Sequence, residues 1–243
     1  MPGEAEIEAG RRLVREAGQV VALTGAGISA ESGVPTFRGA DGLWKTYRPE
    51  DLATPEAFRR NPALVWEWYD WRRQRIAAAR PNPGHEALAR LEKTKPRFTL
   101  VTQNVDGLHQ LAGSRNLHEL HGCLWTLRCV DCGEEREDRT VPLPAIPPRC
   151  ACGGLLRPGV VWFGEPLPVE TLQASLEEAR ACDLLLVVGT SAVVYPAAGV
   201  AHAAVEAGHP VIEINPDETP FTPHATISLR GRAGEILRRI CPP

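Results

Sequence analysis

A chain of 243 residues can bury a large core and has room for one large domain or two. Its hydrophobic content of 43% is ordinary for a soluble protein, and its formal net charge of -3 gives no electrostatic basis for binding nucleic acid or a membrane surface. Residues 1–17 are charged and contain no apolar core, and no apolar run is long enough to span a bilayer. We therefore expect a cytoplasmic protein without a direct nucleic-acid or membrane partner.

The first elements along the chain are a helix and a strand. Residues 7–17 place apolar side chains such as Ile7 and Val14 on one side of a helix, Gly18 ends that helix, and an apolar strand begins at Val20. The strand leads into small residues in the stretch VVALTGAGISAESGVPTFR, which covers residues 20–38. This pattern predicts a strand, a tight turn and the start of a second helix.

That turn has the spacing of a dinucleotide-binding site, because Gly25, Gly27 and Ala30 fit the pattern G-x-G-x-x-G/A. In such a turn the glycines let the backbone approach a pyrophosphate, backbone N–H groups point at the phosphate, and a small third residue lets helix and strand pack closely. The spacing alone is weak support. An ordinary strand-to-helix turn in an α/β domain explains it equally well.

The next part of the chain predicts a loop followed by helices. Residues 32–48 contain glycine, proline and aromatic residues without a clean period, which predicts an ordered loop over the site. Thr54 is a suitable N-cap for a helix that begins at Pro55, and Asn61 precedes a second, aromatic-rich helix from Pro62. A short helix and a strand then follow, over residues 84–93 and 98–102.

Four cysteines in two close pairs predict a zinc site between residues 123 and 158. Seventeen residues separate the Cys129-x2-Cys132 pair from the Cys150-x-Cys152 pair. Four thiolates on tight turns suit tetrahedral zinc and leave no ligand position for water, so we expect a structural metal. Two alternatives are incidental reduced cysteines and a zinc ribbon that binds nucleic acid, although the acidic residues within 134–138 would repel phosphates.

The last third of the chain alternates between strands and helices. The expected elements are a helix over 170–181, a strand over 184–188, a helix over 197–207, strands over 211–215 and 226–229, and a helix over 233–240. The runs LLLVV and VIEI are apolar on nearly every position, as in strands that helices cover on both faces. We therefore predict an α/β fold, a doubly wound parallel sheet interrupted by a smaller domain.

Polar residues follow several of these strands. Gln103, Asn104 and Asp106 come directly after the strand over 98–102, and the carboxyl ends of parallel strands line the ligand crevice of an open α/β sheet. These side chains suit ribose hydroxyls and a carboxamide, although Asn and Asp also build simple turns. GTS (189–191) and Asn215-Pro216-Asp217 end two later strands. The acidic residue that a Rossmann dehydrogenase carries at the end of its second strand is missing.

Two histidines, His118 and His121, lie three residues apart in LHELHGCL. A metal pair is one interpretation, but the cysteines already supply four ligands and no third ligand is evident here. A general base is the better interpretation for one of them, since a neutral imidazole accepts a proton near pH 7. His121 lies just before the cysteine module, at the junction of the two expected domains. A packed or solvated histidine remains the alternative.

These motifs, taken in order, resemble the sirtuin family of NAD-dependent protein lysine deacylases. They are GAGISAESGVPTFRG, TQNVDGLH, LHELHG, the cysteine pairs, VVWFGE, GTS and INP, and they extend over nearly the whole chain. The resemblance implies a Rossmann-like NAD-binding domain, a small domain with a helical insertion and the zinc module, and NAD consumed as a co-substrate. The expected domain boundaries are 1–36, 80–122 and 158–243 for the large domain, and 37–79 and 123–157 for the small one.

The resemblance also assigns roles to individual residues. His121 matches the catalytic histidine, a general base on a ribose hydroxyl, and the nicotinamide end of NAD is expected near Asn104 and Asp106. The residues expected to bind NAD are Gly25, Ala26, Gly27, Ser29, Phe37, Arg38, Trp44, Gln103, Asn104, Asp106, Gly189, Thr190, Ser191, Asn215, Asp217 and Ala233. The substrate peptide is expected to pair as a β-strand with Val161, Trp162 and Phe163.

A finer resemblance concerns the acyl group. Tyr69 and Arg72, in WEWYDWRR, match the Tyr-x-x-Arg pair of desuccinylase-like sirtuins, and small Ala53 would leave room for a longer acyl chain. A guanidinium and a tyrosine hydroxyl suit the terminal carboxylate of succinyl-, malonyl- or glutaryl-lysine. Helical periodicity alone would instead place Tyr69 and Arg72 toward solvent. A plain deacetylase and a mono-ADP-ribosyltransferase are the alternative activities.

Overall fold

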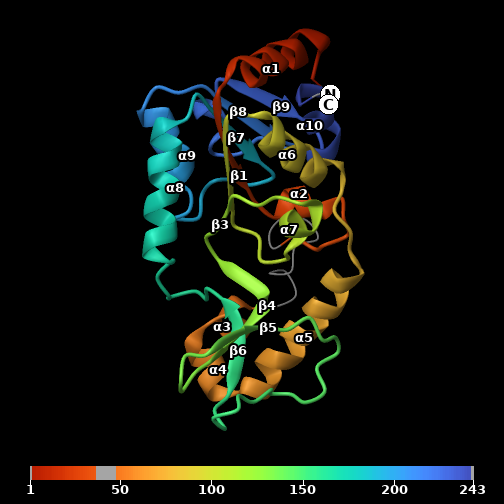
Figure 1. Ribbon diagram of the computed structural model, residues 1–243, viewed down its shortest axis with the longest axis vertical. Helices are drawn as coiled ribbons and strands as arrows, with labels where there is room; N and C mark the ends of the chain where they lie inside the picture. The colour runs from red at the N-terminus through yellow and green to blue at the C-terminus, as the bar shows by residue number, and fades with distance from the viewer. Residues whose placement is uncertain (1, 37–47, 242–243) are drawn as a thin grey trace.

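A six-stranded parallel sheet forms the centre of the computed structural model, which describes residues 2–36 and 48–241 (Figure 1). The strand order is β3-β2-β1-β7-β8-β9, and each neighbouring pair is parallel. The strands are β1 (Gln19–Thr24), β2 (Arg97–Thr102), β3 (Leu117–Glu119), β7 (Leu184–Val188), β8 (Val211–Asn215) and β9 (Ile227–Arg230). The order reverses between β1 and β7, and in open α/β sheets ligands bind outside the strand ends at such a point.

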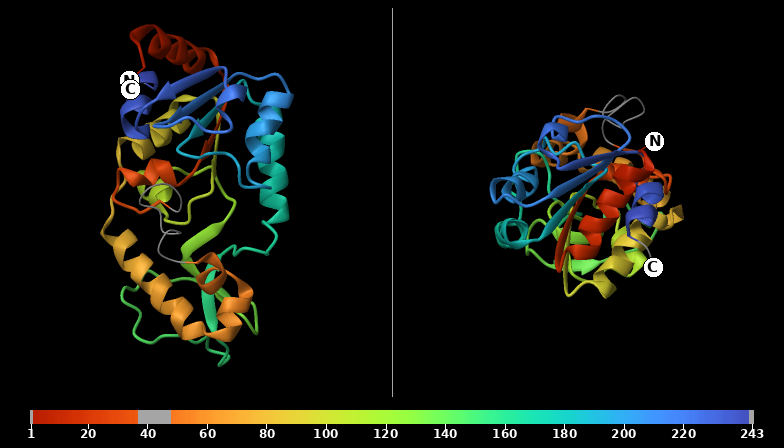
Figure 2. Two further views of the ribbon diagram at one scale, coloured as in Figure 1. Left: turned by 180° about the vertical axis from the view of Figure 1, so that it is seen from behind. Right: turned by 90° about the horizontal axis from the view of Figure 1, so that it is seen from above.

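Helices cover both faces of this sheet, as the apolar strands require. Alternate residues of β1 belong to different cores, with Val20 and Ala22 on one face and Val21 and Leu23 on the other. The first face packs against α1 (Glu4–Glu16), α6 (Pro83–Thr94) and α10 (Ala233–Ile240). The second packs against α8 (Val169–Ala181) and α9 (Gly199–Glu206) (Figure 2). The short helices α2 (Ala26–Ala30) and α7 (Leu108–Ala112) follow β1 and β2. The doubly wound α/β fold predicted from the sequence is therefore confirmed.

A second group of elements lies below the main sheet in Figure 1 and has its own core. It contains three helices, α3 (Pro49–Leu52), α4 (Pro55–Arg60) and α5 (Pro62–Ala78), and an antiparallel sheet of order β5-β4-β6. The strands of that sheet are β4 (Gly122–Cys129), β5 (Glu135–Glu137) and β6 (Leu156–Val160). Trp66 of α5 is fully buried against β4 and β6 residues, and its indole Nε1 donates to the Leu156 carbonyl at 2.7 Å. The boundaries expected between the two domains stay a prediction.

Side-chain caps fix the start of two helices where the sequence predicts them. The Thr54 hydroxyl accepts a hydrogen bond from the Ala57 N–H at 3.1 Å, and Asn61 Oδ1 accepts one from the Leu64 N–H at 3.1 Å. Each cap satisfies an N–H that the first helical turn leaves without a partner. A short 3-10 turn, η2 (Thr222–His224), lies between β8 and β9.

Part of the loop expected over the site, residues 37–47, lies outside the described residues. Phe37, Arg38 and Trp44, which the sequence assigns to NAD binding, belong to that segment. Within residues 2–36 and 48–241, no helix combines the length and the apolar character needed to cross a bilayer.

Candidate active site

The glycine turn lies at the topological switch point, between β1 and β7. The Gly25 N–H donates to the Val188 carbonyl at 3.0 Å, and the Gly27 N–H donates to the Gly189 carbonyl at 2.8 Å. A Cβ atom on Gly27 would lie 2.7 Å from the Gly189 Cα, and one on Gly25 would lie 2.6 Å from the Thr190 Cβ. Both glycines are therefore required by close packing against the end of β7.

This packing corrects two expectations about the turn. The Gly25 N–H donates to Val188 of β7 and the Gly27 N–H to Gly189 directly after it, so these N–H groups are not the ones that point at a phosphate. Ala30 is exposed at the end of α2 and does not bring helix and strand together, whereas the buried Ile28 and Ser29 face the protein interior. The G-x-G-x-x-A spacing occurs in the expected strand-turn-helix context, but packing against a neighbouring strand explains its glycines here.

Ser29, Asn104 and Asp106 form a buried polar cluster beneath the turn. The Ser29 hydroxyl donates to Asp106 Oδ2 at 2.7 Å, and Asn104 Nδ2 donates to the Gly25 carbonyl at 3.0 Å and lies 3.2 Å from the Ser29 hydroxyl. Burial raises the pKa of Asp106, and hydrogen bonds from the Leu108 N–H and Ser29 oppose that shift. The structure thus brings together three residues that sequence motifs far apart in the chain assign to NAD binding.

Two buried histidines, which no sequence pattern singled out, support this cluster. His85 Nε2 lies 3.3 Å from the Ser29 hydroxyl, and His109 Nε2 lies 3.0 Å from Thr24 Oγ1. Their ring centroids are 4.8 Å apart. Burial lowers the pKa of His85 to about 4 and lowers that of His109 well below its ordinary value, so both rings are neutral near pH 7. His109 belongs to the motif TQNVDGLH, which was the available signal for it.

Polar side chains also connect the ends of β2, β7 and β8. Gln103 Nε2 donates to Thr190 Oγ1 at 3.0 Å, and Asn215 Nδ2 donates to the Thr190 carbonyl at 3.2 Å. Gly189 has a φ of 60°, which lets the chain turn directly after β7. Ser191 follows this turn and Asp217 is exposed beyond β8. Gln103 after β2 and Asn215 at the end of β8 therefore both contact Thr190, which follows β7.

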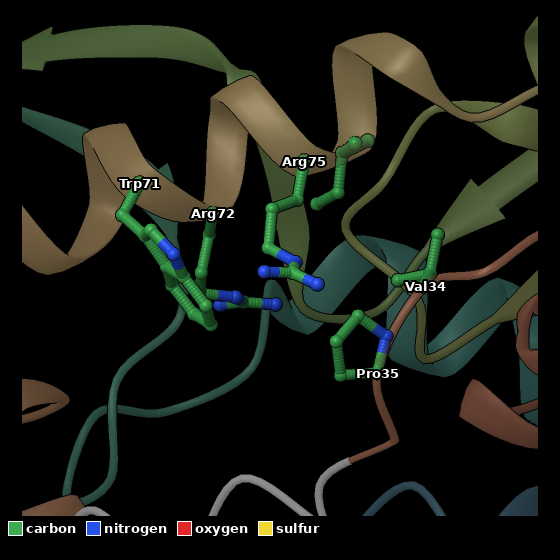
Figure 3. A pocket seen from close by; sticks show the side chains of 6 residues that line it. Val34, Pro35, Trp71, Arg72 and Arg75 are labelled. Atoms are coloured by element: carbon green, nitrogen blue, oxygen red, sulfur yellow. The ribbon is translucent and has the colours of Figure 1, made fainter.

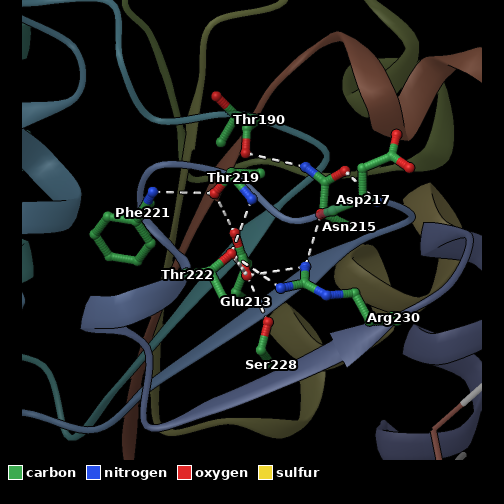
Figure 4. A network of polar contacts seen from close by, with 9 residues as sticks. All are labelled: Thr190, Glu213, Asn215, Asp217, Thr219, Phe221, Thr222, Ser228 and Arg230. Carbon is green, nitrogen blue, oxygen red and sulfur yellow. Dashed lines mark hydrogen bonds and ion pairs between the residues drawn. The ribbon is translucent and has the colours of Figure 1, made fainter.

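A buried acidic residue holds the segment after β8 (Figure 4). Glu213, in the middle of β8, is 0% exposed and forms an ion pair of 3.1 Å with Arg230. Its carboxylate also accepts hydrogen bonds from the hydroxyls of Thr219, Thr222 and Ser228. Four donors therefore converge on one carboxylate and fasten residues 217–224 to β8 and β9. The remaining predicted residues at this side, Ala26 and Ala233, begin α2 and α10.

His121 follows β3 and is oriented by the backbone of Gln103. Its Nδ1 lies 2.9 Å from the Gln103 carbonyl oxygen. A carbonyl oxygen only accepts, so Nδ1 carries the hydrogen and Nε2 holds the free electron pair in the neutral ring. Burial lowers the pKa of His121, and the hydrogen bond to Gln103 partly offsets that shift. The geometry is that of a neutral general base.

His118, by contrast, is part of the packing between β3 and α8. Its Nδ1 lies 2.9 Å from the Ser175 hydroxyl. The only group of three or more potential ligands found among the described residues is the cysteine cluster, so the histidine metal pair finds no support there. Of the two histidines in LHELHGCL, His121 is the one hydrogen-bonded to Gln103, a residue of the predicted NAD site, whereas His118 contacts α8.

Tyr69 and Arg72 of α5 are buried, with exposed fractions of 2% and 6%. The expectation from helical periodicity that they face solvent is therefore wrong. The guanidinium of Arg72 lies 4.9 Å from the centre of the Trp68 ring and 5.7 Å from that of Tyr69. Burial lowers the pKa of Arg72, while Tyr69 and Asp106 raise it. Arg72 also lines a pocket (Figure 3) whose other residues are Val34, Pro35, Trp71, Arg75 and Ile76.

The segment Val161, Trp162 and Phe163 lies directly after β6, between His121 and the helical elements. The Val161 N–H donates to the His121 carbonyl at 2.9 Å, and the Phe163 N–H donates to the Ala53 carbonyl at 2.9 Å. Phe163 is exposed and Trp162 is buried. This segment thus connects the candidate base to the helical elements that carry Tyr69.

The four cysteines Cys129, Cys132, Cys150 and Cys152 form one cluster, with all Sγ atoms within 4.8 Å of one another. Sγ of Cys129 and Cys152 are 3.5 Å apart, and those of Cys132 and Cys150 are 3.7 Å apart. Tetrahedral zinc with Zn–S bonds of about 2.3 Å requires sulfur separations of about 3.8 Å, so the donor set fits the metal. Gly133 and Gly153 have positive φ and close the turn after each cysteine pair. The cluster fits a structural zinc.

The fold and site therefore define an α/β protein with a dinucleotide site at the switch point and a four-cysteine zinc module. Comparison with known proteins agrees with this class. The sequence model of the Sir2 family matches residues 25–196. The chain belongs to the Sir2 family.

Individual relatives match nearly the whole chain. An NAD-dependent protein deacylase of Aquifex aeolicus (strain VF5) is 60% identical over 222 residues, which cover 91% of this chain and 93% of the relative. A Sir2 homologue in complex with NAD superposes with a TM-score of 0.91 at 51% identity, covering 96% of this chain and 92% of that one. A mutant Sir2 homologue bound to 2'-O-acetyl ADP ribose has a TM-score of 0.90 at 50% identity, with coverage of 99% and 95%.

Proposed function

We propose that this protein is an NAD-dependent protein lysine deacylase that gives nicotinamide and an O-acyl-ADP-ribose. The observation that carries this proposal is His121, a neutral base with a free Nε2. Its ring bonds to the carbonyl of Gln103, beside the cluster of Ser29, Asn104 and Asp106, and its own carbonyl accepts from Val161 of the segment 161–163. The names of the deacylase relatives and of the complexes with NAD and acetyl ADP ribose support it. Family membership and site chemistry therefore favour the same activity.

NAD would be held by the residues around the switch point. Bound NAD supplies an electrophilic ribose carbon that carries nicotinamide. Asn104 and Asp106 would contact its nicotinamide end, and Asn215 and Asp217, across Thr190, would contact the adenosine end. The buried network beneath them holds these side chains in place before NAD binds, which lowers the entropic cost of binding.

His121 would remove a proton from a ribose hydroxyl. Gln103 fixes the tautomer, because its carbonyl accepts the Nδ1 hydrogen and leaves Nε2 as the proton acceptor. The lowered pKa keeps the ring neutral at pH 7 without the need for a carboxylate partner. The His121 carbonyl also accepts a hydrogen bond from the Val161 N–H, which fixes the base relative to the proposed peptide-binding segment.

We further propose that the acyl pocket prefers acidic acyl groups, such as succinyl, malonyl or glutaryl. A guanidinium beside a buried tyrosine hydroxyl offers several N–H donors and one O–H donor, which match the two oxygens of a terminal carboxylate. The carboxylate of such an acyl group would accept charge-assisted hydrogen bonds from Arg72 and Tyr69. We also propose that the enzyme works in the cytoplasm on acyl-lysine proteins, without nucleic acid.

The main test measures nicotinamide release with acetyl-, succinyl-, malonyl- and glutaryl-lysine peptides, and mass spectrometry of the products. Deacylation gives free lysine and acylated ADP-ribose, whereas a mono-ADP-ribosyltransferase would add mass to a protein. His121→Ala should lower turnover at least a hundredfold, the usual contribution of a general base, on the order of 10² to 10⁴. His118→Ala is the matched control. Near-native turnover in folded His121→Ala protein would exclude the assigned base.

The acyl preference is tested with Arg72→Met, which keeps a long apolar side chain and removes the charge. We expect kcat/KM for succinyl peptide to fall about a hundredfold more than that for acetyl peptide, since a charge-assisted pair contributes about 2–3 kcal/mol. Equal losses on the two peptides would leave a plain deacetylase as the better assignment.

A further inference from the structure

Trp162 makes a contact that its backbone role does not require. Its indole Nε1 lies 2.9 Å from the Tyr69 hydroxyl oxygen, and both residues are buried. The two ring centroids are 6.5 Å apart, so the hydrogen bond joins the edges of the rings and not their faces. The bond connects the segment proposed to bind peptide with the residue proposed to contact the acyl group.

The direction of this bond determines what the tyrosine can do. An indole N–H is a donor only, so Trp162 donates and the Tyr69 oxygen accepts. The hydroxyl hydrogen of Tyr69 is therefore left to donate elsewhere. Among residues 2–36 and 48–241, the only hydrogen-bond partner of that hydroxyl is Trp162. A buried O–H donor beside the Arg72 guanidinium requires an acceptor, and an acidic acyl chain would provide one.

Trp162 itself is held from several sides. The Arg157 guanidinium lies 3.5 Å from the centre of its ring, and Phe58 packs against the ring at 5.3 Å. Arg157 donates two hydrogen bonds to Glu165, at 2.6 and 2.8 Å. Glu165 also accepts the Trp162 backbone N–H at 2.8 Å. The indole has little freedom to turn, so the position of its N–H is fixed before any substrate binds.

We infer that Trp162 is a positioning residue for acyl selectivity, which orients the Tyr69 hydroxyl so that its hydrogen is presented to an acyl carboxylate. This inference rests on the proposed preference for acidic acyl groups. It adds that the peptide-binding segment and the acyl pocket are one unit, connected by the Trp162–Tyr69 hydrogen bond. An acetyl group has no carboxylate, so its removal does not depend on the direction of this hydroxyl.

The test compares Trp162→Phe with Trp66→Phe. Both substitutions keep an aromatic ring and delete a buried indole N–H bond, but Trp66 bonds to the Leu156 carbonyl and not to Tyr69. We expect Trp162→Phe to lower the ratio of succinyl to acetyl kcat/KM about tenfold, as one hydrogen bond of about 1.4 kcal/mol predicts, mainly through KM for the succinyl peptide. Trp66→Phe should lower stability and keep the ratio. An unchanged ratio in Trp162→Phe, or an equal change in Trp66→Phe, overturns the inference.

A double mutant separates positioning from general packing. Once Tyr69→Phe has removed the hydroxyl, adding Trp162→Phe should change the ratio of succinyl to acetyl kcat/KM less than twofold. If the two substitutions lower that ratio additively, the inference is contradicted. If Trp162→Phe does not fold, indole N–H signals in the NMR spectrum provide the test. Tyr69→Phe should shift the assigned indole N–H signal of Trp162, and succinyl peptide should shift the same signal in the wild type more than acetyl peptide does. Equal shifts with both peptides contradict the inference.

Failure of the inference and failure of the proposed function give different results. If the wild type does not remove succinyl groups, the acyl preference and the inference both fail. The inference alone fails if the wild type removes succinyl groups, Arg72→Met loses that activity, and Trp162→Phe keeps the wild-type ratio of succinyl to acetyl kcat/KM.

Discussion

Replacing Glu213 with glutamine tests whether the buried carboxylate holds the segment after β8 in place. The carboxylate accepts hydrogen bonds from three hydroxyls and pairs with Arg230, and it is fully buried. Glutamine has nearly the same shape, but it replaces one acceptor oxygen with an NH2 donor and removes the charge. The substitution therefore changes chemistry with little change in volume.

The magnitude follows from the bonds that glutamine cannot keep. A glutamine carbonyl in the place of Oε2 still faces Thr222, Ser228 and Arg230, but these bonds weaken without the charge, the Thr219 bond at the other atom is lost or reversed, and Arg230 loses its ion-pair partner. At about 1.5–3 kcal/mol for each bond to a charged group, less what the new NH2 group recovers, we expect a loss of about 2–4 kcal/mol. For a protein of this size that lowers Tm by about 5–12 °C.

The assay combines urea unfolding, followed by circular dichroism, with steady-state kinetics. Because Asn215 and Asp217 flank this network, we expect KM for NAD to rise severalfold while KM for the acyl peptide stays unchanged. Glu206→Gln, at an exposed position in α9, is the matched control and should change the unfolding free energy by less than about 0.5 kcal/mol. Wild-type stability and wild-type KM for NAD in Glu213→Gln would refute the argument that this network positions the segment.

Two further predictions concern His121 and the zinc site. Because burial lowers the pKa of His121, the base stays neutral down to a pH below 6.5, so the acid limb of kcat/KM should lie below that value and should be absent at pH 7–8. An acid limb of kcat/KM centred above pH 6.5 would contradict the environment assigned to His121. Cys129→Ser should reduce bound zinc, measured by metal analysis, and destabilise the small sheet, because the remaining three thiolates leave the tetrahedral site incomplete. Purified wild-type protein without zinc would exclude the structural metal.

The elements that were predictable from the sequence are those set by local patterns. The strand over 184–188 and the helix over 233–240 occur with the predicted bounds, because both carry strong apolar patterns with clear ends. The cap at Thr54 forms as expected, and the helix expected from Pro62 begins there, with Asn61 as its cap. The three-residue strand β3 was missed, since its sequence LHE has no apolar alternation and only pairing with β2 makes it a strand.

The candidate site was less accessible to sequence reasoning where it depends on burial. Polar residues such as His85, His109 and Glu213 are buried through packing between distant elements, and no periodic pattern indicates that. The same limit explains why solvent exposure was the expectation for Tyr69 and Arg72 from helical period alone. Their burial depends on tertiary packing, since residues distant in sequence, such as Trp125 and Trp162, belong to the same core cluster as α5.

Three consecutive residues connect the parts of the site, and their bonds predict which properties change together. Val161 bonds to the His121 carbonyl, Trp162 bonds to the Tyr69 hydroxyl, and Phe163 bonds to the Ala53 carbonyl. A substitution that shifts this segment would move both the proposed base and the proposed acyl pocket, so it should alter turnover and acyl selectivity jointly. A substitution in the Glu213 network lies on the other side of Thr190 and should alter KM for NAD alone. The proposed site thus contains two units, one proposed to bind the co-substrate and one proposed to bind the acyl-lysine, and they are joined by the Gln103–His121 hydrogen bond.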